Sequence, residues 1–381
     1  MSWNRFTLGE ISTNIQTGPF GSQLHQSDYS ETGIPVVMPK DLIDGHISEE
    51  TIARVNEEHV DRLSRHKIDN GDILYSRRGD VGRCAYAAEN EKGWLCGTGC
   101  LRVTINPAIA IPKFVFYQLQ KNETVGWVVN HAVGSTMLNL NTSILSEVPV
   151  ELPPLIIQNR IVEILSAYED LIENNQKQIK LLEEAAQRLY KEWFVDLRFP
   201  GHEDMQIVDG VPEGWKQSKV TELLEIKYGK DHKALEDGEI PVYGSGGVMR
   251  RVKQILYSGE SVLIPRKGSL NNILYVDCDF WTIDTMFYSI PRMKDVAKYS
   301  YLYLITRDMY SFNIGAAVPS MTTKILDGMD ILLPDETALA KFETAVSPLF
   351  EKKKLLEKQN EQLTEARDRL LPKLMSGEIE L

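Results

Sequence analysis

The chain has 381 residues, 43% of them hydrophobic, and its 42 Lys and Arg against 54 Asp and Glu give a formal net charge of −12. This length and composition indicate a globular protein of two or three domains and exclude a disordered chain. No apolar run approaches the roughly 20 residues that cross a bilayer, and the start has no signal-peptide pattern. We therefore expect a cytoplasmic protein without membrane contact, whose four unevenly spaced cysteines are free thiols.

Residues 1–153 predict an irregular α/β domain. The stretches GIPVVMP, GDILYSRRGDVGRCAYAA and GWLCGTGCLRVTIN are rich in β-branched and aromatic residues and are broken by glycines, as is typical of short strands joined by turns. Pro112 stands first in the apolar segment PKFVFYQLQKN and is expected to open a helix.

Residues 154–196 predict one long helix. Its apolar positions alternate in steps of four and three residues, which is the pattern of a helix that packs lengthwise on another helix. A helix of about 36 residues is roughly 54 Å long, more than one domain of this size can cover, so a partner helix is expected. The predicted seam includes Ile161, Leu165, Tyr168, Ile172, Asn175, Ile179, Leu182 and Leu189.

Residues 197–334 predict a second α/β domain with the same order of elements. The strand-like stretches GEIPVYGSGG, GESVLIPRKGSLNNILYV and FWTIDTMFYSIP precede a helix expected from Asp295. Residues 335–381 predict a second long helix, whose seam contains Leu349, Leu356, Asn360, Leu363 and Leu370. Pro348 fits the first turn of a helix better than its interior, so we expect this helix to start afresh or kink there.

The two halves of the chain end in similar amino-acid sequences. GSTMLNLNTSILSEVPVELPP begins at Gly134 and GAAVPSMTTKILDGMDILLPD begins at Gly315, an offset of 181 residues. Near the beginnings of the halves, Trp3 matches Trp215 at an offset of 212. The second half is therefore 31 residues shorter in its middle, and the chain is a duplication whose edges agree while its interiors differ.

This organisation predicts an α+β fold in which two irregular α/β domains alternate with two long helices. Two copies related by a pseudo-two-fold axis place these helices antiparallel, as a coiled coil. Asn175 and Asn360 are polar members of the seam, and we expect them to fix its register.

The chain resembles the specificity subunit of a type I restriction-modification system. The resemblance is carried by the paired stretches ILSEVPVELPP…QNRIVEIL and ILDGMDILLPD…AKFETAV, the helix ends EEAAQRLYKEWF and TEARDRLLPKLMSGEI, and the stretch PEGWKQSKVTEL. It implies an N-terminal target-recognition domain over residues 1–153, a central spacer helix over 154–196, a C-terminal target-recognition domain over 197–334 and a C-terminal spacer helix over 335–381.

What the resemblance implies for function is a non-catalytic subunit that reads double-stranded DNA and recruits methyltransferase subunits and restriction subunits that translocate DNA. S-adenosylmethionine, ATP and Mg are then expected on those partner chains, with no cofactor and no metal in this one. Because the two domain interiors differ, we expect an asymmetric target of two half-sites separated by unspecified bases, with the spacer helices setting the separation.

The sequence lacks the common motifs of catalysis. NPAI at Asn106 has only the first half of the Asn/Asp-Pro-Pro-aromatic motif of an adenine methyltransferase, and there is neither a G-x-x-x-x-G-K-[ST] phosphate loop nor an H-E-x-x-H zinc motif. A self-contained DNA-modifying enzyme is therefore the disfavoured alternative. A coiled-coil scaffold with two ligand-binding domains, which the acidic charge suits, is the other.

Because the chain is acidic, DNA contacts must come from local patches and from partner chains, and we expect the isolated chain to bind DNA weakly. Phosphates are bound by Lys, Arg and small polar side chains, and base edges mostly by Arg, Lys, Asn and Gln. The candidates in the first domain are Gln23, Lys40, Arg77, Arg78, Ser135, Thr136, Asn139 and Asn141. Those in the second are Lys230, Lys233, Arg250, Arg251, Lys253, Arg266, Lys267, Ser320, Thr322 and Lys324.

Overall fold

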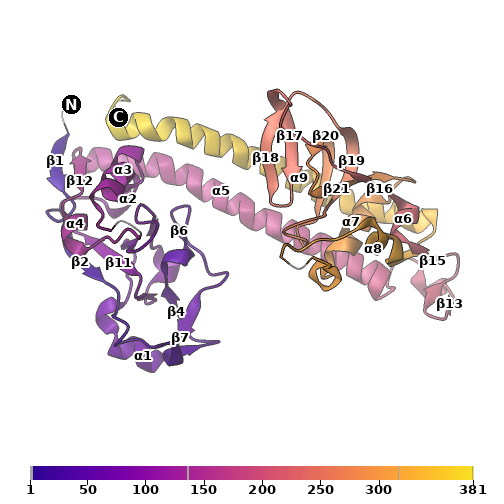
Figure 1. Cartoon of the computed structure of the whole chain (residues 1–381), viewed down its shortest axis with the longest axis horizontal. Helices are drawn as coiled ribbons and strands as arrows, with labels where there is room; N and C mark the ends of the chain where they lie inside the picture. The colour runs from indigo at the N-terminus through magenta and orange to yellow at the C-terminus, as the bar shows by residue number, and fades with distance from the viewer. Residues whose placement is uncertain (1–2, 135–136, 316, 380) are drawn as a thin grey trace. The chain divides into compact units, whose positions relative to one another are not determined.

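The computed structural model describes residues 3–134, 137–315, 317–379 and 381 (Figure 1). The chain divides into two compact units, residues 1–173 with 361–381 and residues 174–360. Each unit holds one α/β domain and a part of both long helices. A search of the described helices found no segment with the length and apolar character of a membrane span.

The first unit is built on a four-stranded antiparallel sheet of order β2-β11-β8-β9, with bounds β2 Ser12–Thr17, β8 Ile73–Ser76, β9 Cys84–Tyr86 and β11 Cys100–Ile105. A second sheet has the order β10-β4-β7-β3, with bounds β3 Tyr29–Ser30, β4 Ile34–Val37, β7 Ala53–Val55 and β10 Leu95–Cys96. The remaining elements are the hairpin β5 (Leu42–Ile43) and β6 (His46–Ile47) and the helices α1 (Glu57–Arg62), α2 (Pro112–Leu119), α3 (Asn122–His131) and α4 (Thr142–Ser146). As predicted, Pro112 opens its helix, where its missing N–H costs nothing.

The second unit has one six-stranded sheet of order β16-β21-β19-β20-β17-β18, in which only β20 and β17 pair parallel. The bounds are β16 Leu224–Tyr228, β17 Asp237–Gly244, β18 Gly247–Val252, β19 Tyr257–Pro265, β20 Leu274–Thr282 and β21 Met286–Pro291. The hairpin β13 (Ile207–Val208) and β14 (Val211–Pro212) and the helices α6 (Val220–Leu223), α7 (Ala297–Ile305) and α8 (Thr323–Gly328) complete it. The helix expected from Asp295 begins two residues later, because Asp295 has a left-handed backbone with φ of 64°.

The shared part of the two units is a four-stranded sheet with one topology. In each, the first strand pairs with the last, the last with the second and the second with the third, as β2-β11-β8-β9 and as β16-β21-β19-β20. The offset between equivalent residues falls from 211 at Gly18 and Gly229 to 189 at Arg77 and Arg266. Most of the 31-residue difference therefore lies between the first and second strands, where the first unit adds β3, β4, β7 and α1 and the second adds β17 and β18.

A two-stranded ladder closes each half. β1 (Asn4–Thr7) pairs antiparallel with β12 (Pro149–Leu152), and β15 (Lys216–Lys219) with β22 (Asp330–Leu333). In both ladders the first residue of the early strand stands opposite the last residue of the late strand. Each ladder therefore pairs a strand from the beginning of its half, where the sequence offset is 212, with a strand from its end, where the offset is 181.

Both predicted long helices are present, as α5 (Leu155–Tyr190), followed by one π-helical turn, and α9 (Glu336–Ser376). In the first unit the beginning of α5 packs on the end of α9, where Leu165 and Leu374 share a buried cluster. In the second unit the end of α5 packs on the beginning of α9 through Ala186 and Phe342. The two helices therefore run antiparallel within each unit, and every residue of the predicted seam is buried or half-buried.

The expected new start at Pro348 is wrong, because α9 runs without interruption from Glu336 to Ser376. The alternative expectation, a kink at Pro348, stays a prediction. A proline inside a helix loses one hydrogen bond and crowds the preceding turn. Here buried side chains hold the helix on both sides of it, with Phe342 and Val346 before Pro348 and Leu356 after it. Tertiary packing therefore outweighs the local preference.

Candidate nucleic-acid interface

Two loops of the first unit are joined by backbone hydrogen bonds. We call residues 77–79, after β8, the cation loop, and residues 133–140, of which 133, 134 and 137–140 are described, the closing loop. The N–H of Leu140 donates to the carbonyl of Arg77 at 2.8 Å, and that of Gly79 donates to the carbonyl of Leu138 at 3.1 Å. Arg78 and Asn139 form the β-bridge between these contacts, so the cation loop is held at a fixed place on the closing loop.

The second unit repeats this arrangement, with residues 266–268 after β19 as its cation loop and residues 314–321, except 316, as its closing loop. The N–H of Met321 donates to the carbonyl of Arg266 at 2.9 Å, and that of Gly268 donates to the carbonyl of Pro319 at 2.9 Å. Lys267 and Ser320 form the β-bridge. The stretches SRRG and PRKG therefore occupy the same position in the two units.

A third loop meets the same end of each shared sheet. After β2, Gly18 donates to the carbonyl of Cys100 at 2.9 Å, and after β16, Gly229 donates to the carbonyl of Met286 at 3.0 Å. The glycine loops TGPFG and YGKDH, the cation loops and the closing loops thus converge in each unit. This convergence is the candidate interface.

Five of the predicted DNA-contacting cations are exposed, and none of the five has a side-chain hydrogen bond or ion pair with another described residue. A cation without an acidic partner retains its full charge for a phosphate. They are Arg78, Lys230, Lys233, Lys267 and Lys324.

The inner residues of the cation loops are partly buried. Among the described residues, neither the buried Nε of Arg77 nor the buried Oδ1 of Asn139 on the adjoining closing loop has a hydrogen-bond partner. Arg266, the counterpart of Arg77 in the second unit, donates to the carbonyl of Asp284 at 3.0 Å. The guanidinium of Arg266 lies 5.4 Å from the ring centroid of Tyr228. A half-buried guanidinium stacked on an aromatic ring has a fixed direction, which suits directional recognition.

Other candidates are engaged within their own unit. Lys40 donates to Thr51, the amide oxygen of Gln23 accepts from the N–H of Phe20, and Asn141 caps α4 by accepting from the N–H of Ile144. In the second unit Arg250 pairs with Asp237, Lys253 pairs with Glu236 at 2.7 Å and Arg251 donates to the carbonyl of Glu239 at 3.1 Å. These contacts stabilise strands and turns and leave less charge available to a polyanion.

The hydroxyl and amide candidates on the closing loops are divided. Ser135 and Thr136 lie outside the described residues. The backbone of Ser320 is held by the Oδ1 of Asn313 at 2.8 Å, and Thr322 stands at the N-cap of α8 without a side-chain capping bond.

Sequence reasoning overlooked the exposed apolar side chains near these loops. Phe20 in TGPFG and Tyr228 in YGKDH are each about half exposed, and Met137 on the closing loop is 62% exposed. Their residue types predict core positions, so composition gave no signal. The neighbouring glycines and the 181-residue repeat could have indicated them.

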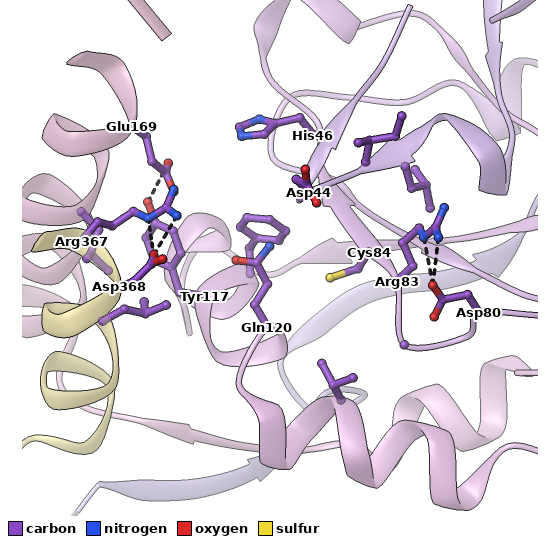
Figure 2. Close-up of a pocket in the computed structure, with 18 of the residues that line it drawn as sticks. Asp44, His46, Asp80, Arg83, Cys84, Tyr117, Gln120, Glu169, Arg367 and Asp368 are labelled. Carbon is purple, nitrogen blue, oxygen red and sulfur yellow. Dashed lines mark hydrogen bonds and ion pairs between the residues drawn. The ribbon is translucent and has the colours of Figure 1, made fainter. Parts of the chain in front are cut away.

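A cleft of the first unit with a cavity volume of about 800 Å³ is lined by none of these loop residues (Figure 2). Its charged side chains pair with one another, as Arg83 does with Asp80 at 3.0 Å and Arg367 with Asp368 at 2.7 Å. Glu169 accepts from the hydroxyl of Tyr117 at 3.0 Å. The acidic groups in this lining equal or outnumber the cations, so the cleft is unsuited to a polyanion.

Bound metal ions and reactive thiols are two common sources of catalytic chemistry. No group of three or more His, Cys, Asp or Glu side chains among them is placed to hold a metal ion. Burial raises the pKa of the Cys84 and Cys96 thiols to about 12, so these thiols stay protonated at neutral pH and are poor nucleophiles.

Comparison with known proteins gives a consistent result. The MjaIX type I restriction enzyme specificity subunit of Methanocaldococcus jannaschii is 27% identical over 387 residues, which cover 92% of this chain and 88% of that protein. The HindI type I restriction enzyme specificity subunit of Haemophilus influenzae is 21% identical over 468 residues, covering 99% of each. The crystal structure of a type I restriction-modification S subunit from M. genitalium shares the fold, with a TM-score of 0.64 at 19% identity over 98% of this chain and 96% of that one.

The family model for the type I restriction modification DNA specificity domain matches residues 1–184 and again residues 212–365. The two matches fall on the two halves of the duplication, each with its own sheet and loop assembly. This chain therefore belongs to the family of type I restriction modification DNA specificity domains.

Proposed function

We propose that this chain is the non-catalytic specificity subunit of a type I restriction-modification enzyme, which reads a bipartite asymmetric DNA target. The observation that carries the proposal is that one loop assembly is built twice on domains whose other loops differ. Shared backbone geometry presents each domain to the same kind of ligand. Different side chains on that geometry read different sequences.

The candidate contacts differ between the two units. Phe20 and Gln23 lie in or just after the first glycine loop, whereas Lys230 and Lys233 lie in or just after the second. Glutamine pairs with adenine, whereas lysine pairs with guanine or with phosphate, so this difference supports two unlike half-sites.

The acidic balance supports a role within a larger complex. With a net charge of −12, the chain gains little from counterion release when it meets DNA alone. We infer that methyltransferase and restriction subunits supply further phosphate contacts, and that S-adenosylmethionine, ATP and Mg²⁺ bind on those subunits. Such a complex acts in the cytoplasm, where its DNA substrate lies.

The decisive experiment expresses the chain with the methyltransferase of its own system in a methylation-free host and maps modified adenines across the genome. The expected result is a motif of two unlike half-sites separated by unspecified bases. Methyltransferase expressed alone should leave the genome unmodified. An identical methylation pattern with and without this chain would contradict the proposal.

A further inference from the structure

The closing loops of the two units present the same apolar side-chain positions to solvent. Val133 and Met137 in the first unit correspond, at the offset of 181, to Ile314 and Val318 in the second. All four side chains are more than half exposed. A single exposed apolar residue is ordinary, but the same pair at the same positions of a duplicated loop indicates a shared contact.

Backbone hydrogen bonds join the two ends of the closing loop in each unit. In the first, Val133 and Asn139 exchange backbone hydrogen bonds of 3.0 and 2.8 Å, and in the second Ile314 donates to the carbonyl of Ser320 at 3.0 Å. A Cβ on Gly134 would stand 2.3 Å from the carbonyl oxygen of Met137, and Gly134 has a φ of +127°. A side chain at position 134 would therefore strain the first closing loop.

Charge identifies the kind of partner. Arg78 bridges the first closing loop at Asn139, and Lys267 bridges the second at Ser320. Both cations are exposed and neither forms an ion pair with a described residue. An apolar pair beside an unpaired cation matches the alternation of deoxyribose and phosphate along a DNA strand better than it matches an apolar protein groove.

We propose that each closing loop with its cation loop is a sequence-independent DNA anchor, in which Arg78 or Lys267 binds a phosphate and Met137 or Val318 packs on the adjacent deoxyribose. The inference rests on the proposed function, because its logic is that the half-sites differ. An element with one geometry and one chemistry in both units cannot distinguish two different sequences. It contacts what the two half-sites share, which is the sugar-phosphate backbone.

The test measures binding by the full chain in complex with its methyltransferase subunits, on DNA carrying the mapped target and on a scrambled duplex, over a salt series. The double variant Arg78→Ala/Lys267→Ala should weaken binding to both duplexes by the same factor. It should also reduce the slope of log K against log salt by about 0.9 for each phosphate that is no longer bound. The double variant Met137→Ser/Val318→Ser should weaken binding to both duplexes without changing the slope of log K against log salt. Neither double variant should alter the methylated motif.

Matched controls come from one exposed segment of the second unit, with Lys294→Ala for the cations and Met293→Ser for the apolar residues. Both controls should bind as the wild type does. A loss of affinity confined to the target duplex, or a changed motif, would show that the loops read bases and would overturn the proposal. Unchanged DNA binding, with or without dissociation of the methyltransferase subunit, would also overturn it, and dissociation would assign the loops to a protein contact. If the wild-type complex itself has no preference for a target, it is the specificity function that fails.

Discussion

Asn175 of α5 donates a hydrogen bond from Nδ2 to the Oδ1 of Asn360 on α9, at 2.9 Å. Both residues belong to the second unit, and Asn175 is 4% exposed within an otherwise apolar seam. A buried amide pair of this kind is satisfied in one alignment of the two helices and unsatisfied in a shifted one. We therefore propose that this pair fixes the register of the two helices.

Replacing one member of this pair should cost more than replacing both. Asn175→Leu leaves the amide of Asn360 without its partner and should lower the free energy of unfolding by about 1–3 kcal/mol. The double variant Asn175→Leu/Asn360→Leu should recover or exceed wild-type stability. Denaturant unfolding of all four proteins in a double-mutant cycle measures the coupling, and additive losses of stability would contradict the assigned role.

Pro348 should reduce the stability of α9. It is exposed within a continuous helix, so Pro348→Ala restores a backbone donor without disturbing the core. Alanine is favoured over proline in a helix interior by about 3 kcal/mol. Part of this gain is lost because the unfolded chain is more flexible with alanine than with proline. We therefore expect the free energy of unfolding to rise by about 1–2 kcal/mol. Thermal unfolding measures it, with Pro154→Ala before α5 as a control that should change little. An unchanged melting temperature for Pro348→Ala would show that the helix is already relaxed around the proline.

The fold could be predicted further than the site. The long helices could be predicted because their apolar seam repeats over many turns. The duplication could be predicted because the two halves share matching amino-acid stretches. The strands that pair with the first strand of each half could not be predicted. Asn4, for example, pairs with Leu152, and pairing between strands so far apart in the sequence leaves no local pattern. The interior length difference gave no sign that it would become a second sheet in one unit and an added hairpin in the other.

The candidate site shows the same limit at the level of side chains. Lys230 and Lys253 look equivalent in the sequence, yet of the two only Lys253 pairs with a described acid, Glu236, which lies 17 residues away in the chain. Whether a cation is neutralised depends on the strand pairing that brings the acid to it. The exposed Met137 and Val318 were overlooked because a Met or Val is expected in the core.

Lys298 of α7 links the second domain to α9. Its side chain is 9% exposed and its Nζ contacts Glu260 at 2.8 Å and Glu343 of α9 at 2.6 Å. Lys298→Met should lower the free energy of unfolding by about 2 kcal/mol, because it leaves partly buried carboxylates without their cation. Urea unfolding measures this change, and Lys294→Met, at an exposed position, is the control that should change nothing.

The same link predicts a pH dependence. Burial alone would raise the pKa of Glu260, but hydrogen bonds from Lys298 and Tyr275 outweigh it and hold this pKa below the ordinary 4.5. A lowered carboxyl pKa contributes stability above about pH 4.5 that is lost as the pH falls through the folded-state value. The stability gap between wild type and Lys298→Met should therefore shrink as the pH is lowered below 4.5. A gap that is constant from pH 7 to pH 3 would contradict the ion-pair assignment.

Exchange of one reading domain should change one half-site. We propose the boundaries 1–153 and 197–334 for the two domains, and the first keeps β1 and β12 together, so their ladder is transferred intact. A chimera with residues 1–153 of another family member should methylate a motif with a new half-site on one side and the original on the other. Genome-wide mapping of modified adenines reads this directly. Loss of both half-sites, or retention of both, would contradict the division of labour between the domains.

Unpaired cations should matter more for DNA binding than paired ones on the same domain. Lys230 and Lys233 are exposed, and neither forms an ion pair with a described residue, whereas Lys253 is neutralised by Glu236 at 2.7 Å. In the complex with methyltransferase subunits, Lys230→Ala/Lys233→Ala should weaken DNA binding and reduce the salt slope by about 0.9 for each phosphate that these lysines neutralise in the wild type. Lys253→Ala should leave the slope unchanged, because a cation already paired with a carboxylate releases few counterions from DNA. Binding isotherms at several salt concentrations measure both effects. If Lys253→Ala reduced the salt slope as much as Lys230→Ala/Lys233→Ala does, DNA binding would depend on the total charge of the domain. The absence of an acidic partner would then be the wrong criterion for identifying DNA-binding cations.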